Sequence, residues 1–168
     1  GLVFSIYLFF SISEAFKYHK IDKELLEDTS FTPLVSVIIP SHGTDFQTIK
    51  ATLKASLRIN YLNYEIIVSD SGIDTITSTK LNKFCTDNNI HYYHKKDNRG
   101  FKAGNINAVL PHSKGEFILI LDSDHIPYPD IIENIISQFK NPKVGFVQAR
   151  TKARNASGFS YKAANSIL

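Results

Sequence analysis

The feature that most constrains this chain is an unbroken apolar run, Phe117 to Leu121, which ends in two carboxylates, Asp122 and Asp124. Large apolar residues without alternation are typical of a strand covered on both faces, and such strands belong to parallel sheets between layers of helices. Open α/β sheets bind their ligands at the carboxyl ends of the strands. The run therefore predicts a buried strand that delivers two acids to a binding edge.

Two carboxylates separated by one residue suit a hard divalent cation. Mg²⁺ in particular is usually held by one or two protein carboxylates, with substrate phosphates and water completing its coordination. We therefore interpret Asp122 and Asp124 as ligands of Mg²⁺ or Mn²⁺ in a metal-diphosphate site. The alternative is a solvated turn with a helix cap before Pro127, because short Asp-x-Asp matches are common.

The composition indicates one domain and excludes several classes of function. The chain has 168 residues, of which 43% are hydrophobic, and this is sufficient for a single core. The net charge of +3 is mild and the basic residues form no long block, so a nucleic-acid partner is not expected. The single cysteine, Cys85, excludes an internal disulfide and is expected to be a core residue.

The amino-terminal segment has the character of a membrane end. Its apolar run, Leu2 to Ile12, is shorter than the roughly 20 residues that a spanning helix needs. Aromatic residues and lysines accompany the run, as in the interfacial belt and positive cytoplasmic flank of membrane helices. We therefore expect residues 1–20 to be the end of a transmembrane or interfacial helix, with the domain that follows it in the cytoplasm, in a chain cut from a longer protein. An amphipathic or core helix and a signal-peptide remnant are the alternatives.

Strands and helices alternate along the body of the chain. The predicted strands lie at residues 35–40, 64–68, 90–94, 117–121 and 144–148. The predicted helices follow Asp45, span 76–84 and 102–109, and occupy 129–139. This order implies an α/β fold with a doubly wound, mostly parallel sheet. The expected divisions are a linker at 21–33, the sheet domain at 34–154 and the start of a truncated element at 155–168.

Polar residues of complementary kinds follow the predicted strands. Ser41 follows the first strand, Asp70 follows the second, and Lys102 begins the helix beyond the third. An acid such as Asp70 can accept a hydrogen bond from a base or a ribose, and a lysine at a helix amino terminus can meet phosphate charge. Together with the acids after the fourth strand they indicate a nucleoside diphosphate site. Each of them also has an ordinary alternative role in a turn, a cap or a solvated loop.

Several segments resemble family 2 glycosyltransferases with a GT-A fold, and within that family the cellulose-synthase-like membrane enzymes. Residues 35–40 resemble the first strand of the family, and 67–72 resemble its second-strand motif, whose first acid contacts uridine. Residues 102–107 are similar to a cellulose synthase segment in which the lysine lies near the diphosphate. The segment 122–127, Asp-Ser-Asp-His-Ile-Pro, resembles the metal-binding element, and 146–148 resembles the fifth strand.

The resemblance covers residues 34 to 150 and implies metal-dependent, inverting transfer of a sugar from a UDP-sugar to a polysaccharide or lipid acceptor. The implied nucleotide-sugar-binding residues are Pro40, Ser41, Asp70, Lys102, Asn105, Asp122 and Ser123, and the implied metal ligands are Asp122 and Asp124. The sequence departs from the family at Ser41-His42-Gly43, where Thr-Tyr-Asn/Glu is usual, and at Ser71, which replaces a second acid.

The family's catalytic-base acid and its Gln-x-x-Arg-Trp segment have no counterpart in this sequence, so we expect the base beyond Leu168. The chain by itself is then expected to bind the donor and to be inactive. A non-catalytic nucleotide-binding module is an alternative of another class. A nucleotidyltransferase on a similar sheet is a third, and it is disfavoured because no Gly-rich signature loop follows the first strand.

Overall fold

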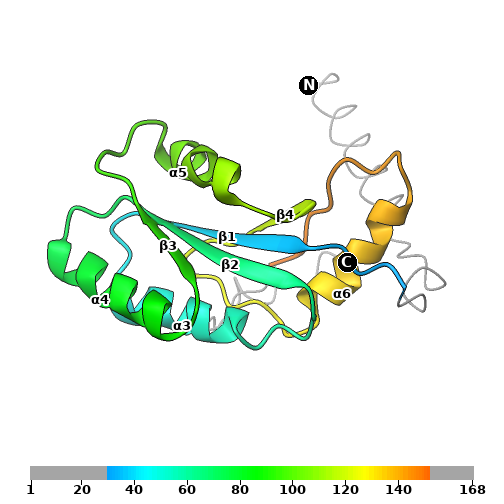
Figure 1. Ribbon diagram of the computed structural model, residues 1–168, viewed down its shortest axis with the longest axis horizontal. Coiled ribbons are helices and arrows are strands. Elements are labelled where there is room, and N and C mark those ends of the chain that lie inside the picture. Colours follow the sequence, from blue (N-terminus) through cyan, green and yellow to red (C-terminus); the bar gives the residue numbers. More distant parts are fainter. Residues whose placement is uncertain (1–29, 152–168) are drawn as a thin grey trace, which may run out of the picture.

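The computed structural model describes residues 30–151, whose centre is a four-stranded parallel sheet (Figure 1). The strands are β1 (Val35–Ser41), β2 (Tyr64–Asp70), β3 (His91–His94) and β4 (Phe117–Ile120). Their order is β3-β2-β1-β4, and all three pairings are parallel. The predicted parallel α/β sheet is therefore confirmed.

Several expectations concern residues outside the described range. They are the membrane-proximal helix at 1–20, most of the linker at 21–33 and the element at 155–168. Within residues 30–151, no helix is long and apolar enough to cross a membrane.

β1 is the central strand of the site, and all seven of its residues are buried. It lies between β2 and β4, and its β-branched residues fit a pleated surface that is covered on both faces. Val37 and Ile39 point into the larger core, whereas Ile38 points into a smaller one on the opposite face. β1 thus contributes side chains to the cores on both faces of the sheet and ends at the proposed binding edge.

The helices cover the two faces of the sheet unequally. On one face lie α3 (Phe46–Ser56), α4 (Thr75–Asp87) and α6 (Ile131–Ile136), and on the other face lies α5 (Phe101–Val109) (Figure 1). A 3-10 turn, Leu110–His112, follows α5, and a second one, Ser137–Lys140, follows α6. The helix predicted at 129–139 is therefore a short α-helix that continues as a 3-10 turn.

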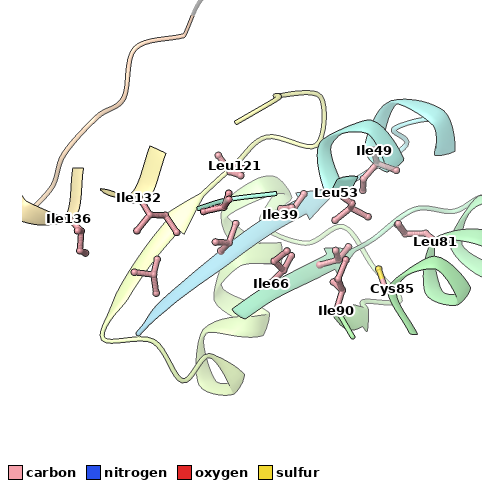
Figure 2. Close-up of a cluster of buried hydrophobic side chains, with 14 residues drawn as sticks. Ile39, Ile49, Leu53, Ile66, Leu81, Cys85, Ile90, Leu121, Ile132 and Ile136 are labelled. Carbon is pink, nitrogen blue, oxygen red and sulfur yellow. The ribbon is translucent and has the colours of Figure 1, made fainter. Parts of the chain in front are cut away.

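The larger core lies between the sheet and the three helices of the first face (Figure 2). α3 contributes Ile49 and Leu53, and α4 contributes Leu81 and Cys85. Burial of each large aliphatic side chain contributes about 1.5–3 kcal/mol. Cys85 is fully buried, so its prediction as a core residue is confirmed.

The direction in which strands are added to the sheet reverses after β3. β2 and β3 are added on one side of β1, and β4 then lies on its other side. The connections through α3 and α4 pass over one face, and the connection through α5 passes over the opposite face. The carboxyl ends of β1 and β4 flank this reversal, which is the position where open α/β sheets bind ligands.

Two details of the predicted sheet are wrong. β4 is not covered on both faces, because Ile118 and Ile120 are 38% and 46% exposed. The reason is that α5 packs over β1 and β2, while β4 lies at the edge of the described sheet. Residues 144–148 form no strand in the described part of the chain, because none of its strand pairings includes them, and β-propensity makes a strand only beside a partner.

Candidate functional site

A cavity of about 550 Å³ lies at the carboxyl ends of β1 and β4. Its walls are the loop after β1, the region around the start of α5 and the turn after β4. The predicted site residues that line it are Pro40, Ser41, Lys102, Asn105, Asp122, Ser123 and Asp124. The volume lies within the range of small-molecule sites. The structure therefore brings together all the predicted donor and metal residues except Asp70.

The turn after β4 presents Asp122 and Asp124 to the cavity. Both carboxylates are accessible to solvent, and Lys102 Nζ donates a hydrogen bond to Asp122 Oδ1. His125 Nε2 lies 3.8 Å from Asp122 Oδ2 and 3.9 Å from Asp124 Oδ1, beyond hydrogen-bond range. Lys102 is thus the positive group in direct contact with Asp122.

The donor set at this turn decides what kind of metal site is possible. Within residues 30–151, no group of three or more His, Cys, Asp or Glu side chains is arranged to hold a metal by itself. Mg²⁺ needs only one or two protein carboxylates when substrate phosphates supply further oxygens. Asp122 and Asp124 therefore fit a cation that binds together with a diphosphate, rather than one enclosed by protein ligands.

Two threonines that were not predicted hold Ser123 between the acids. Thr44 Oγ1 lies 2.7 Å from Ser123 Oγ, and Thr52 Oγ1 donates to the Ser123 carbonyl oxygen at 2.9 Å. Thr52 is buried beside Ile49 and Leu53 on the apolar face of α3. A polar residue on an apolar helix face needs a hydrogen-bond partner inside the fold. The place of Thr52 in the helical pattern was therefore the sequence signal from which such a buried hydrogen bond could have been predicted.

A polar network, partly buried, lies along the wall of the cavity. Asn105 Nδ2 donates to the Ser41 carbonyl oxygen at 3.2 Å and to Ser71 Oγ at 2.8 Å. His42 Nδ1 lies 2.9 Å from the Ser71 carbonyl oxygen and 3.2 Å from Ser71 Oγ. Ser41, His42 and Ser71, three of the positions at which the sequence departs from the family pattern, therefore belong to one network. Asn105 contributes by fixing the loop after β1.

Asp70 lies outside the cavity lining and is buried. Its Oδ1 accepts from the Gly72 N–H at 2.9 Å, and its Oδ2 accepts from Ser78 Oγ at 2.6 Å and from Tyr92 Oη at 2.8 Å. Burial, followed by the bond to Asp70, raises the pKa of Tyr92. Asp70 thus ties the turn after β2 to α4 and β3, and its contact with a nucleoside stays a prediction.

The basic residues before α5 have different roles from Lys102. Lys95 Nζ donates to the Arg99 carbonyl oxygen at 2.7 Å and lies 2.9 Å from Asp97 Oδ1. The hydrogen bond from Lys95 lowers the pKa of Asp97. Lys95, Lys96 and Arg99 do not line the cavity. Lys95 therefore shapes this loop, whereas Lys102 lines the cavity.

The start of α5 has an unusual backbone. Gly100 and Phe101 both have positive φ, 76° and 50°. The Gly104 N–H donates to the Gly100 carbonyl oxygen at 2.8 Å, which closes this turn. Phe101 lines the cavity beside Lys102 with its side chain exposed. Sequence reasoning did not single out Phe101, because nothing in the pattern marks a phenylalanine for a left-handed conformation.

The parallel sheet, the reversal of strand order and the cavity at the carboxyl ends of β1 and β4 define an open α/β protein with a cavity at its switch point. The model of glycosyl transferase family 2 matches residues 36–167, and the chain belongs to this family.

Relatives and solved structures agree with this assignment. The cellulose synthase catalytic subunit (UDP-forming) of Xanthomonas axonopodis pv. citri is 29% identical over 122 residues, which cover 72% of this chain and 16% of the relative. The glucosyltransferase WfgD of Escherichia coli, named for UDP-Glc and a GlcNAc-diphosphoundecaprenol, is 32% identical over 114 residues, which cover 68% of this chain and 44% of WfgD. The expected resemblance to cellulose synthases is confirmed, and the chain spans a minor part of both relatives.

The structural comparison confirms the expected GT-A-like fold. The mannosyltransferase PcManGT of Pyrobaculum calidifontis, solved in complex with GDP-Man and Mn²⁺, superposes with a TM-score of 0.60 at 25% identity. The match covers 73% of this chain and 39% of PcManGT.

Proposed function

We propose that this chain supplies the donor-binding region of a metal-dependent, inverting glycosyltransferase that acts at a membrane on a polysaccharide or lipid acceptor. The donor is a nucleotide sugar, UDP-linked, with Mg²⁺ or Mn²⁺. The observation that carries the proposal is the convergence of Lys102, Asp122 and Asp124 on one cavity at the strand reversal. Support comes from a relative named as UDP-forming and from a structural neighbour that holds a nucleotide sugar with Mn²⁺.

The charges in the cavity suit a diphosphate. Lys102 pairs with Asp122 in the described structure, and an incoming diphosphate would offer the ammonium group phosphate oxygens instead. Asp122 and Asp124 would then hold the metal, whose chemical contribution is to stabilise the negative charge of the departing diphosphate. The amino end of α5, where Lys102 lies, adds peptide N–H groups that favour an anion.

The remaining predicted residues would bind the rest of the donor. Pro40 and Ser41 form the wall at the end of β1, and Asn105 holds the Ser41 carbonyl group in place. Ser123 is fixed between the two acids by α3 and the loop before it. Asp70 would reach a base or ribose only after exchanging its present hydrogen bonds for new ones.

Inverting transfer needs an acid on the acceptor side, within hydrogen-bond reach of the attacking hydroxyl group. The acids that line the cavity are Asp45, Asp122 and Asp124. Asp45 accepts hydrogen bonds from the Gln47 and Thr48 N–H groups at 3.0 Å each, as the cap of α3, and the other two are the proposed metal ligands.

A general base contributes about 10²- to 10⁴-fold to the rate. The three acids that line the cavity are already assigned to a helix cap and to the metal. We therefore expect this chain alone to bind the donor but not to transfer sugar at an enzymatic rate, which is also how a non-catalytic binding module would behave. Transfer from a radiolabelled UDP-sugar at such a rate would contradict this expectation and would point to Asp45 or Asp97 as the base.

Calorimetric titration tests the proposed donor site. UDP and GDP are titrated with and without Mn²⁺ into the unsubstituted chain, Asp124→Asn and Asp130→Asn. Asp130 is an exposed control carboxylate outside the cavity. We expect nucleotide binding that requires Mn²⁺, a loss of at least about tenfold in Asp124→Asn, and no change in Asp130→Asn. Equal affinity in the two variants would refute the metal assignment.

A further inference from the structure

Phe101 stands out among the residues that line the cavity. Its side chain is 75% exposed although it is a large aromatic group, and it lies next to Lys102 in the chain. Neither of the two hydrophobic clusters of the described residues includes it. The ring therefore contributes little apolar burial to the fold.

The backbone of Phe101 is also unfavourable. Its φ of 50° lies in the left-handed region, which costs free energy for any residue that has a Cβ and is rare for bulky side chains. Gly100 before it has a φ of 76°, which is ordinary for glycine. The fold thus keeps a phenylalanine in a strained conformation and leaves its ring in solvent. Such strain occurs preferentially at ligand sites.

The turn that carries the ring is held firmly. The Phe101 N–H donates to the Asn98 carbonyl oxygen at 3.0 Å, and Lys95 Nζ holds the Arg99 carbonyl oxygen. A Cβ on Gly104 would lie 2.0 Å from that same oxygen, so the helix and the loop are in close contact. The backbone that carries the ring is therefore fixed before any ligand binds, which reduces the entropic cost of binding.

We propose that Phe101 is the platform on which the nucleoside of the donor stacks, a role that rests on the proposed nucleotide-binding function. The phosphates are assigned to Lys102 and to the cation that the two acids of the β4 turn would hold, so the neighbouring ring would meet the adjoining part of the same ligand. Stacking on an aromatic face tolerates every base. Phe101 therefore supports binding of uridine and guanosine nucleotides alike, and base selection belongs to other residues.

The test compares Phe101→Asn with Phe101→Trp and with the control Phe146→Asn. Asparagine tolerates the left-handed region and removes the ring, whereas tryptophan keeps a stacking surface. Phe146 is 81% exposed and does not line the cavity. Melting temperature is measured for each variant, together with the Kd for UDP, GDP and inorganic pyrophosphate in the presence of Mn²⁺.

We expect Phe101→Asn to weaken UDP and GDP binding by about 5- to 150-fold, the range that corresponds to loss of one base-aromatic stack. Its melting temperature and its affinity for pyrophosphate should not fall. Phe101→Trp and Phe146→Asn should bind UDP as the unsubstituted chain does.

Three results would overturn the inference while leaving the proposed function intact. The first is unchanged UDP binding in Phe101→Asn. The second is an equal loss of pyrophosphate binding, which would mean that the ring positions Lys102. The third is a large fall in the melting temperature of Phe101→Asn, which would make the ring structural. Failure of the unsubstituted chain to bind UDP, GDP or pyrophosphate would instead contradict the proposed function, and this inference with it.

Discussion

Replacement of Gly104 by alanine offers a direct test of how α5 is seated. Within a helix, glycine is less favourable than alanine by about 1 kcal/mol, so helix propensity alone predicts that Gly104→Ala stabilises the protein. The structure predicts the opposite. A Cβ at this position would lie 2.0 Å from the Arg99 carbonyl oxygen and 3.0 Å from its carbonyl carbon, well inside the 3.4–4 Å of ordinary contact.

The expected loss of stability in Gly104→Ala depends on which atoms must move to make room for the Cβ. The clashing atoms belong to the backbone, so no side-chain rotation can relieve the contact, and the Lys95 bond to the Arg99 carbonyl oxygen would be displaced. Overpacking costs about 1–3 kcal/mol, and a backbone contact of 2.0 Å places this substitution in the upper part of that range, at about 2–3 kcal/mol. After the gain in propensity, we expect a net loss of about 1–2 kcal/mol, which corresponds to a fall in melting temperature of roughly 2–8 °C.

The assay is thermal unfolding of Gly104→Ala beside the matched control Gly145→Ala, because a Cβ on Gly145 meets nothing within 4 Å. Gly145→Ala should unfold within about 2 °C of the unsubstituted chain. UDP binding with Mn²⁺ should weaken only in Gly104→Ala, because the displaced turn carries Lys102. A melting temperature for Gly104→Ala equal to or above that of the unsubstituted chain would refute the close contact between α5 and its loop.

Three further predictions follow from buried or capping groups. Thr52→Val should lower the unfolding free energy by about 1–2 kcal/mol, because the Ser123 carbonyl oxygen loses its donor, and Thr52→Ser should not. Burial raises the pKa of Cys85 to about 12, so iodoacetamide should label this thiol at pH 8 only after the protein unfolds. An adduct on Cys85 in the mass spectrum of the native protein would contradict this prediction. The hydrogen bond from the Thr48 hydroxyl group lowers the pKa of Asp45 from its ordinary value of 3.8. The Asp45 carboxylate therefore stabilises the fold above pH 3.8, and this stabilisation is lost as the pH falls through the lowered pKa. A difference in unfolding free energy between the unsubstituted chain and Asp45→Ala that grew on acidification would contradict this prediction.

Much of the site could be predicted because parallel strands end at a common edge. The apolar runs identify β1 and β4, and once they are parallel, Ser41 and Asp122 must lie near each other. The spacing of the two acids after β4 and the lysine at the start of α5 then show which charged groups lie at this edge. The cavity assembled from these residues is therefore a consequence of strand direction, which the alternation of strand and helix patterns along the sequence indicates.

Other features depend on contacts between distant residues that periodicity does not encode. The orientation of Asp70 is set by Ser78 and Tyr92, which belong to two other elements. The exposure of Ile120 depends on which strands α5 covers, and its apolar character alone does not show this. Local propensity favoured a strand at 144–148, but a strand also requires a neighbour with unpaired backbone groups in register.

The ion pair between Lys102 and Asp122 links the two halves of the proposed donor site. Without ligand, the ammonium group balances one of the two carboxylates that would hold a cation, so a metal arriving alone must compete with Lys102. A diphosphate arriving alone faces the negative charge of both acids. When the metal and the diphosphate both bind, the phosphates can engage Lys102 and share the cation with the two acids. Binding of the metal therefore favours binding of the diphosphate, and binding of the diphosphate favours binding of the metal. Linkage requires this coupling to be equal in both directions. In the proposed site, the same three side chains would thus make metal affinity and nucleotide affinity mutually dependent, so that the metal would bind together with the donor.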